Sequence, residues 1–336
     1  MHGSQQTAAG RWRLPLALVT VYLAWGGTYP AIRVMVETVP PLLGTAARFA
    51  LAGSLLAAAL FVRGGRRRFA LTRKQLLGAS ATGAVILGDI GLLALAEQEV
   101  PAGLAALIIA SVPLWIVVLR IVDRQRPGPS PIAAVVVGLA GVALLAGPAG
   151  GPDSPPVGWL VLLVAAAMIE AAGQFYSQRT ELPRDPLVSA AVQLMAAAAV
   201  LAAAGIALGE TSELASERLS RDSLVAFAYL VVPGSITAYI AFVWLLANAP
   251  ISTVSTYAYV NPLVAVFLGW ALLSEEVTAA MAAGAAAVLL SVALIVRRPP
   301  RPQTYPAAPS VGCSSGRLDY NGEAKDVDEL GDAQER

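Results

Sequence analysis

The sequence predicts an all-α integral membrane protein with ten transmembrane helices, arranged as two inverted five-helix repeats. Three observations lead to this fold class. The composition is too apolar for a soluble domain, long stretches carry no charged residue, and Lys and Arg are distributed very unevenly between the loops on the two expected sides of the membrane.

The composition excludes several classes of protein. Of the 336 residues, 57% belong to the hydrophobic set and 13% are charged, whereas a soluble domain is about 45–50% apolar and about 25% charged. The hydrophobic core of a soluble domain cannot bury so many apolar residues, so a soluble globular protein is excluded. Disordered chains are polar and charged, which excludes disorder for most of the length. A net charge of +1 offers no basic surface for nucleic acid.

The rare residues argue against a metal site or a cofactor. The chain has one Cys, Cys313, and one His, His2, whereas zinc, haem and iron–sulfur sites need clusters of ligands. The sequence also lacks a Gly-rich phosphate loop with its Lys. We therefore expect no metal, no cofactor and no enzymatic activity.

Runs without charge locate the membrane spans, because about 20 apolar residues cross the hydrocarbon core. Nineteen uncharged residues separate Arg13 from Arg33, and 52 separate Asp222 from Glu275. The longer run must hold two helices, and Asn248-Ala249-Pro250 supplies the turn between them. With Gly, Pro and charge clusters as boundaries, the expected helices cover residues 14–36, 42–62, 75–96, 101–122, 130–147, 157–179, 186–208, 223–246, 251–273 and 278–296.

The distribution of Lys and Arg predicts the orientation, since cytoplasmic loops are enriched in these residues. With the N-terminus inside, 16 of the 23 lie in inner loops and 2 in outer loops. We expect a multi-pass protein of the inner membrane with both termini in the cytoplasm. Residues 1–13 form the cytoplasmic N-terminal segment. Residues 298–336, rich in Pro, Ser, Gly and acidic side chains, form a disordered cytoplasmic tail.

The sequence repeats itself weakly. Pro41-Leu42 followed by Arg48 corresponds to Pro186-Leu187 followed by Gln193. The two repeats cover residues 14–147 and 157–297. Because each holds five helices, an odd number, the second enters the membrane upside down relative to the first. Inverted repeats suit alternating access around a site near the midplane.

Ionisable residues inside spans cost about 2.5 kcal/mol or more, so each needs a partner or a wet cavity. Arg33 is expected to pair with Glu37, one turn further on. Arg48 and Asp89 lie at matching depth on neighbouring helices, which predicts that they are partners. Three interpretations stay open for them: a structural ion pair, an anion-binding Arg48 held by Asp89, or an Asp89 that exchanges protons.

Glu170 lies near the midplane and begins a polar stripe that continues with Gln174. In a membrane, such a stripe is either interhelical hydrogen bonding or the wall of a pathway. The carboxylate favours the pathway. The expected substrate or proton pathway is completed by further uncharged candidates: Trp25, Thr28, Tyr29, Gln193, Tyr239, Tyr259 and Asn261. For each of these side chains, the alternative role is helix packing.

Two segments carry a resemblance to a known family. Ala24-Trp25-Gly26-Gly27-Thr28-Tyr29-Pro30 resembles the aromatic–glycine opening of EamA-type transporters of the drug/metabolite transporter superfamily. The stretch from Asn261-Pro262 through Glu275-Glu276-Val277-Thr278 to Gly284 is similar to the closing pattern of that family. The resemblance covers about residues 14–297 and implies export or exchange of small metabolites, amino acids or drugs, often with ion coupling. The sequence departs from the family in carrying Glu170 where the repeat predicts an aromatic residue.

Together these features predict a secondary transporter, an exporter of small metabolites such as amino acids, related polar or amphipathic solutes, or drugs. It would work by alternating access, with protons coupled through Glu170 or Asp89. Its expected partners are a small-molecule substrate, protons and the lipid bilayer, without nucleic acid, and assembly as a homodimer is left open. The alternatives are an intramembrane lipid-modifying enzyme, which would need paired carboxylates or a metal site near one face, and a membrane scaffold without transport.

The expected topology can be tested with reporter fusions. A reporter fused within the C-terminal tail should report a cytoplasmic position, and one inserted at 210–222 should report the opposite side, because of the 16-to-2 distribution of Lys and Arg. A tail that reports outside would require an odd number of spans and would overturn the inverted repeat.

Overall fold

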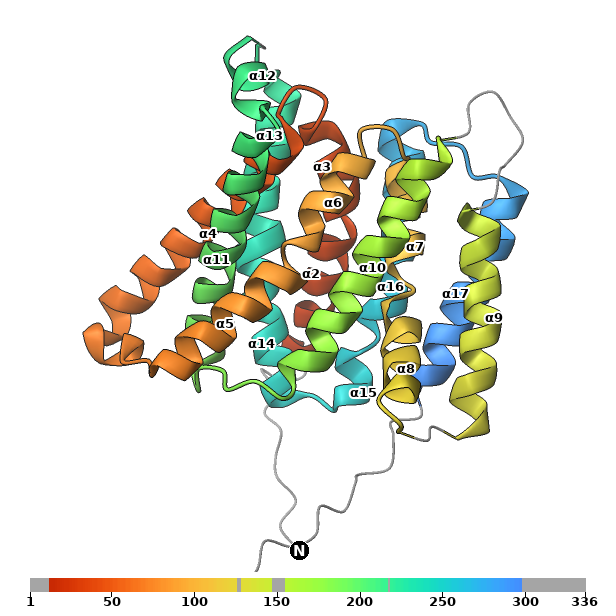
Figure 1. Ribbon diagram of the computed structural model, residues 1–336, viewed down its shortest axis with the longest axis horizontal. Helices are drawn as coiled ribbons and strands as arrows, with labels where there is room; N and C mark the ends of the chain where they lie inside the picture. The colour runs from red at the N-terminus through yellow and green to blue at the C-terminus, as the bar shows by residue number, and fades with distance from the viewer. Residues whose placement is uncertain (1–11, 126–127, 147–154, 217, 298–336) are drawn as a thin grey trace, which may run out of the picture. The chain divides into compact units, whose positions relative to one another are not determined.

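The computed structural model describes residues 12–125, 128–146, 155–216 and 218–297, and within these ranges all regular structure is helical (Figure 1). The expected tail 298–336 and most of the N-terminal segment 1–13 lie outside the described residues. The elements are α2 (Arg13–Gly26), α3 (Thr28–Met35), α4 (Pro41–Gly64), η1 (Arg66–Phe69), α5 (Arg73–Ile86), α6 (Asp89–Ala96), α7 (Ala102–Ile109), α8 (Val112–Val122), α9 (Pro129–Ala146), α10 (Val157–Ser177), α11 (Pro186–Ala207), α12 (Glu210–Ser216), α13 (Arg221–Tyr229), η2 (Leu230–Thr237), α14 (Ala238–Asn248), α15 (Ile251–Val254), α16 (Tyr257–Leu273) and α17 (Ala279–Arg297).

Eight helical segments of the described residues are long and apolar enough to cross a membrane. These candidate spans are Pro41–Gly64, Arg73–Ala96, Ala102–Val122, Val157–Ser177, Pro186–Ala207, Arg221–Asn248, Ser252–Leu273 and Ala279–Val296. The two other expected spans are also helical, but Pro129–Leu145 is shorter and the first is divided into α2 and α3. The protein is thus an all-helical multi-pass membrane protein. The ten-helix, two-repeat arrangement stays a prediction.

Several of the long segments are interrupted in the middle, and prolines lie at three interruptions. Pro30 falls in the first turn of α3, Pro113 in the first turn of α8, and Pro233 inside η2, a π-helical stretch. Proline has no amide hydrogen and its ring clashes with the preceding turn, so the regular helical ladder cannot continue through it. The freed polar groups must then find partners inside the protein, because lipid offers none.

Helices from the two halves of the sequence pack against each other. α4 packs along α11 and α9 along α17, while α2 contacts α14 and α16. α10 in turn packs against α5, α6 and α8. The approach of α9 to α17 depends on small residues: a Cβ added at Gly141 would lie 2.9 Å from the Cβ of Ala287 and 3.0 Å from the carbonyl of Gly284. Small residues at such crossings let two membrane helices come into close contact.

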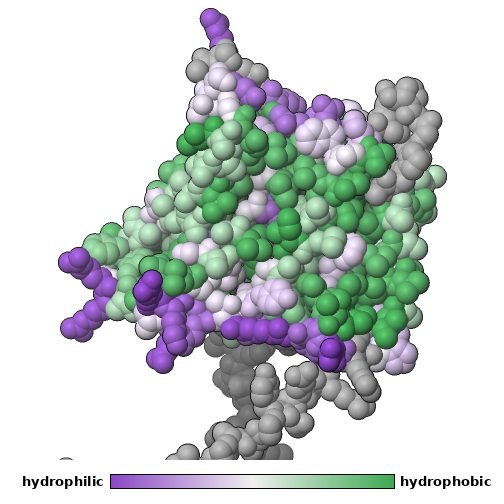
Figure 2. Space-filling view, viewed as in Figure 1, coloured by the Kyte–Doolittle hydropathy of each residue, from purple (hydrophilic) through white to green (hydrophobic). Residues whose placement is uncertain are grey.

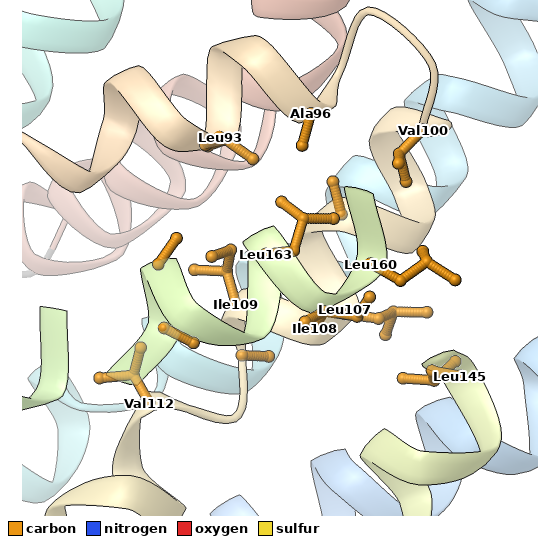
Figure 3. Close-up of a cluster of buried hydrophobic side chains, with 14 of the residues drawn as sticks. Leu93, Ala96, Val100, Leu107, Ile108, Ile109, Val112, Leu145, Leu160 and Leu163 are labelled. Carbon is orange, nitrogen blue, oxygen red and sulfur yellow. The ribbon is translucent and has the colours of Figure 1, made fainter. Parts of the chain in front are cut away.

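The largest cluster of buried apolar side chains lies among α6, α7, α8 and α10. Leu160 and Leu163 of α10 lie opposite Leu93 of α6 and Leu107 of α7 (Figure 3). Leu107 and Leu163 are fully buried. On the surface, apolar residues cover the middle of the face shown in Figure 2, and hydrophilic residues gather at its upper and lower ends. This banding is what a membrane-embedded surface requires.

One end of the bundle is held by two glutamates, each of which binds the start of a helix from the first half. The carboxylate of Glu275 accepts hydrogen bonds from the amides of Ala102 (2.6 Å) and Gly103 (3.0 Å) at the start of α7. The carboxylate of Glu210 likewise accepts from the amides of Leu42 (3.0 Å) and Leu43 (2.7 Å) at the start of α4. Helix N-termini present free amides and a partial positive charge, so a carboxylate is a strong partner for them. We call this the clamp end.

Glu97 is buried at the clamp end, in the turn between α6 and α7. Its side chain is 0% exposed, and neither carboxylate oxygen has a hydrogen-bond partner. Burial raises the pKa of the Glu97 carboxyl well above its usual range, and the nearby Glu275 adds to the rise.

The expected pair of Arg33 with Glu37 is wrong. Arg33 donates instead to the backbone carbonyl of Glu97, which lies at the end of α6 and has no amide partner beyond the helix end.

The opposite end is held by ion pairs that water can reach. Arg68, after α4, lies 3.1 Å from Asp185, before α11, and their side chains are 38% and 26% exposed. Arg179, after α10, pairs with Asp123, after α8. The hydrogen bond from Arg179 lowers the pKa of Asp123 below its ordinary value. Each pair joins the two halves of the sequence, but water screens exposed pairs, so they add little to stability.

Replacing Glu275 should weaken the clamp end measurably. In the Glu275→Gln variant the charge is lost and one amide faces an NH₂ group, so we expect a loss of about 1.5–3 kcal/mol, the range for hydrogen bonds to charged groups. Thermal unfolding of the detergent-purified protein would measure it. Glu276→Gln is the matched control, since Glu276 is the exposed neighbour. Equal midpoints for the two variants would contradict the clamp.

Candidate functional site

A cavity of about 380 Å³ lies between helices of both halves. Its wall includes residues of α2 and α3, α4, α6 and α8 from the first half, and of α10, α11, η2, α14 and α16 from the second. Small-molecule sites are concave and mostly apolar, with a few convergent polar groups. Here the polar groups include three ionisable residues from membrane segments, namely Arg48, Asp89 and Glu170.

The structure brings ten of the eleven candidate side chains to the wall of this one cavity. They are Trp25, Thr28, Tyr29, Arg48, Asp89, Glu170, Gln174, Gln193, Tyr239 and Asn261. Tyr259 is not among the lining residues, whereas Tyr257 is. The helix is broken between α15 and α16, and at 3.6 residues per turn two positions apart are nearly opposite faces. The prediction of one continuous helix over residues 251–273 therefore points to Tyr259, whereas Tyr257 lines the cavity. What each lining residue does in function remains a prediction.

One part of the wall is aromatic. The ring centroid of Trp25 lies 5.0 Å from that of Phe242 and 5.3 Å from that of Tyr257, and Phe242 and Tyr257 are 5.5 Å apart. These separations and tilted geometries are favourable for aromatic pairs. The indole nitrogen of Trp25 also donates to the carbonyl of Gly234 in η2, at 3.2 Å, which fixes the ring. The cavity thus offers a rigid apolar surface.

Arg48 is held at the cavity by the π-helical stretch. It is 4% exposed, and its Nε donates to the hydroxyl of Ser235 at 3.0 Å. Ser235 in turn donates to the carbonyl of Leu230 at 2.9 Å, five residues back in η2. The wide turn around Pro233 therefore supplies the Ser235 hydroxyl that orients Arg48 and the Leu230 carbonyl that orients Ser235. Ser235 was not among the residues predicted from the sequence, because nothing in its local pattern marks a π-helical turn.

The predicted ion pair between Arg48 and Asp89 is not formed. Among the described residues, the ion pairs join Arg68 to Asp185 and Arg179 to Asp123. Asp89 is 4% exposed, and its Oδ1 has no hydrogen-bond partner. Equal depth in the membrane says nothing about the direction in which each helix turns its side chain, and this is why the prediction failed.

The carboxylate of Glu170 has one protein partner. Its Oε1 accepts a hydrogen bond from the Gln174 side chain at 2.8 Å, one turn further along α10. The predicted stripe continues as far as Ser177, whose hydroxyl donates to the carbonyl of Gln174. Elsewhere on the wall, Gln193 donates to the hydroxyl of Ser189 at 2.9 Å, and Oδ1 of Asn261 has no partner.

The described residues contain no group of three or more His, Cys, Asp or Glu side chains that could hold a metal ion. A polar cavity inside a multi-pass helical bundle is typical of membrane transporters. A family model described as the EamA-like transporter family matches residues 13–147 and 157–297. The chain therefore belongs to the EamA-like transporter family, which confirms the resemblance seen in its sequence.

Individual relatives agree with this assignment. The uncharacterized inner membrane transporter YedA of Escherichia coli strain K12 is 35% identical over 276 residues, covering 80% of this chain and 86% of YedA. A probable terminal-alkyne amino-acid exporter of Streptantibioticus cattleyicolor is 30% identical, covering 85% and 93%. A solved structure, described as the crystal structure of a protein, has 24% identity and a TM-score of 0.57, covering 84% and 96%, and shows the same fold.

Because Arg48 and Asp89 form no ion pair, their substitutions should act independently. We expect the losses of stability for Arg48→Gln and Asp89→Asn to add within about 0.5 kcal/mol in the double variant. Thermal unfolding of the three purified variants tests this. A double variant more stable than either single one would show that the two charges compensate each other directly.

Proposed function

We propose that this protein is a proton-coupled secondary transporter that exports small metabolites, such as amino acids or related polar or amphipathic solutes, across the inner membrane. The observation that carries the proposal is the cavity itself, which places Arg48, Asp89 and Glu170 on one wall formed by both halves. Ionisable groups are expensive at this depth and mark substrate or ion pathways.

The pattern of helix contacts supports two inverted repeats, 14–147 and 157–297. In this scheme α2 and α3 correspond to α10, α4 to α11, and α9 to α17. α4 packs on its counterpart α11, and α9 on α17. The contacts of α2 with α14 and α16 are mirrored by those of α10 with α6 and α8. A two-fold relation of this kind allows the halves to exchange inward and outward shapes around a shared site.

In the proposed orientation, both termini are cytoplasmic and the clamp end faces outward. The two glutamate contacts then close the outer side, while the exposed ion pairs bridge the cytoplasmic side. During export, the glutamate contacts would break when the cavity opens outward, and the exposed ion pairs would break when it opens to the cytoplasm. The excess of Lys and Arg in the loops of the cytoplasmic side supports this orientation.

Glu170 is the proposed proton carrier. A carboxylate in a water-poor cavity favours its protonated, uncharged form, and access to water on one side favours release of the proton. Its Oε1 accepts a hydrogen bond from the Gln174 side chain, and the residue lines the cavity. Alternation of the cavity between the two sides would therefore couple proton movement to solute movement.

In liposomes, Glu170→Gln should fold normally and lose pH-driven flux, because Gln keeps the polar contact but cannot ionise. A flux screen with amino acids, sugars and cationic dyes would first supply the solute. Glu99→Gln, an exposed acid in the turn before α7, is the matched control and should retain flux. Flux of the Glu170→Gln variant with an unchanged pH dependence would reject Glu170 as carrier and leave Asp89 as the candidate.

A further inference from the structure

We infer that the turn between α4 and α5 is a binding site for the headgroups of anionic phospholipids. We call residues 63–74 the basic turn. It connects two candidate membrane spans, Pro41–Gly64 and Arg73–Ala96, so a bilayer around the protein places it at the level of the lipid headgroups. None of its residues lines the cavity, so this site is separate from the solute pathway and goes beyond the proposed function.

The basic turn concentrates positive charge in a stretch without acidic residues. Its six cationic residues are Arg63, Arg66, Arg67, Arg68, Arg73 and Lys74. All six are exposed, and the chain has no Asp or Glu from residue 38 to residue 88. Arg68 pairs with Asp185, whereas the other five form no ion pair with a described residue. Five cations on one turn are therefore available to an anion from outside the protein.

Contacts with the rest of the protein hold the backbone of the basic turn in place. Phe69 and Leu71 pack against the buried apolar cluster that is formed mainly by α4 and α11. Thr72 and Gln75 form a capping box at the start of α5, and both of its hydrogen bonds are 3.1 Å long. The cationic residues before and after these anchors are thus presented on a folded turn, which lowers the entropy lost when a ligand binds.

The surroundings of the basic turn match the two parts of a lipid. Figure 1 shows α4 and α5 meeting at the lower left corner of the molecule, and Figure 2 shows hydrophilic side chains at this corner with an apolar surface above them. The helix residues next to the turn include four exposed large apolar side chains: Phe61, Val62, Leu76 and Leu77. A phospholipid joins an anionic headgroup to apolar chains, whereas a soluble anion would match the cations alone. The combination therefore favours a lipid.

The start of α5 gives a physical reason for an anion to bind there. The helix begins with Arg73 and Lys74, and its first turn has no acidic residue. A helix N-terminus carries a partial positive charge, so cations at this position are repelled by the helix and by each other. The phosphate of a lipid headgroup would offset this repulsion. Clusters of four to eight Lys and Arg directly beside a membrane helix are typical of surfaces that bind anionic lipids.

Native mass spectrometry of the full-length protein in detergent can measure which lipid it retains. The protein is mixed with equal amounts of dioleoyl phosphatidylglycerol, which is anionic, and dioleoyl phosphatidylcholine, which has the same chains and no net charge. We expect a preference of about tenfold or more for phosphatidylglycerol, because each Lys or Arg near an anionic surface adds about fivefold to binding.

Two double variants assign the preference to the basic turn. Each removes two exposed cations: Arg66→Gln with Arg67→Gln, and Arg73→Gln with Lys74→Gln. Both leave the apolar anchors and the capping box in place, so they should fold normally, which thermal unfolding in detergent without added lipid would check. Each should lose most of the preference for phosphatidylglycerol and retain phosphatidylcholine as the unmodified protein does.

The matched control is Arg120→Gln with Arg124→Gln, which removes two cations near the end of α8 and should keep the preference. Loss of the preference in this control as well would mean that total charge selects the lipid, and would overturn the assignment to the basic turn. Equal retention of the two lipids by the unmodified protein would also overturn it. An excess of glycerol phosphate, which has the anion without the chains, should not displace phosphatidylglycerol, and displacement would show a site for soluble phosphate instead.

Discussion

Polar backbone groups inside a bilayer have no water to bind, so each interruption of a helix must be matched by a partner elsewhere in the protein. The ends of helices face the same need, and in this chain long-range contacts meet it. Glu275 and Glu210 serve the free amides of α7 and α4, and Arg33 serves the carbonyl of Glu97. Each contact joins segments that are distant in the sequence. The same requirement that makes interruptions costly therefore ties together elements that lie far apart in the chain.

The π-helical stretch η2 meets this constraint and also shapes the cavity. Its widened turn brings Ser235 against the carbonyl of Leu230 and leaves the carbonyl of Gly234 for the indole of Trp25. Arg48 is held through the same serine. One irregular turn thus orients both the cation and an aromatic face of the cavity. Irregular helical turns of this kind often occur at functional sites.

The sequence was sufficient to locate the helices and most of the polar side chains on the cavity wall, because charge, proline and hydropathy act locally. It could not supply side-chain directions across breaks. The choice of Tyr259 assumed one continuous helix over residues 251–273, where α15 and α16 are separate, and Tyr257 lines the cavity. The pairing of Arg48 with Asp89 assumed that equal depth means contact. Ser235 and the buried Glu97 depend wholly on tertiary contacts, so no local pattern marks them.

The two ends of the bundle differ in how their contacts respond to the surrounding solution. Mobile ions screen exposed charges over about 10 Å at 0.1 M salt, but they act far less on groups shielded from water. The pair of Arg68 and Asp185, with side chains 38% and 26% exposed, therefore weakens as ionic strength rises. The part-buried contacts of Glu275 with amides at the start of α7 weaken far less. In the proposed orientation, the salt content of the cytoplasm alone would thus shift the resting balance between the two shapes, even when no solute is bound.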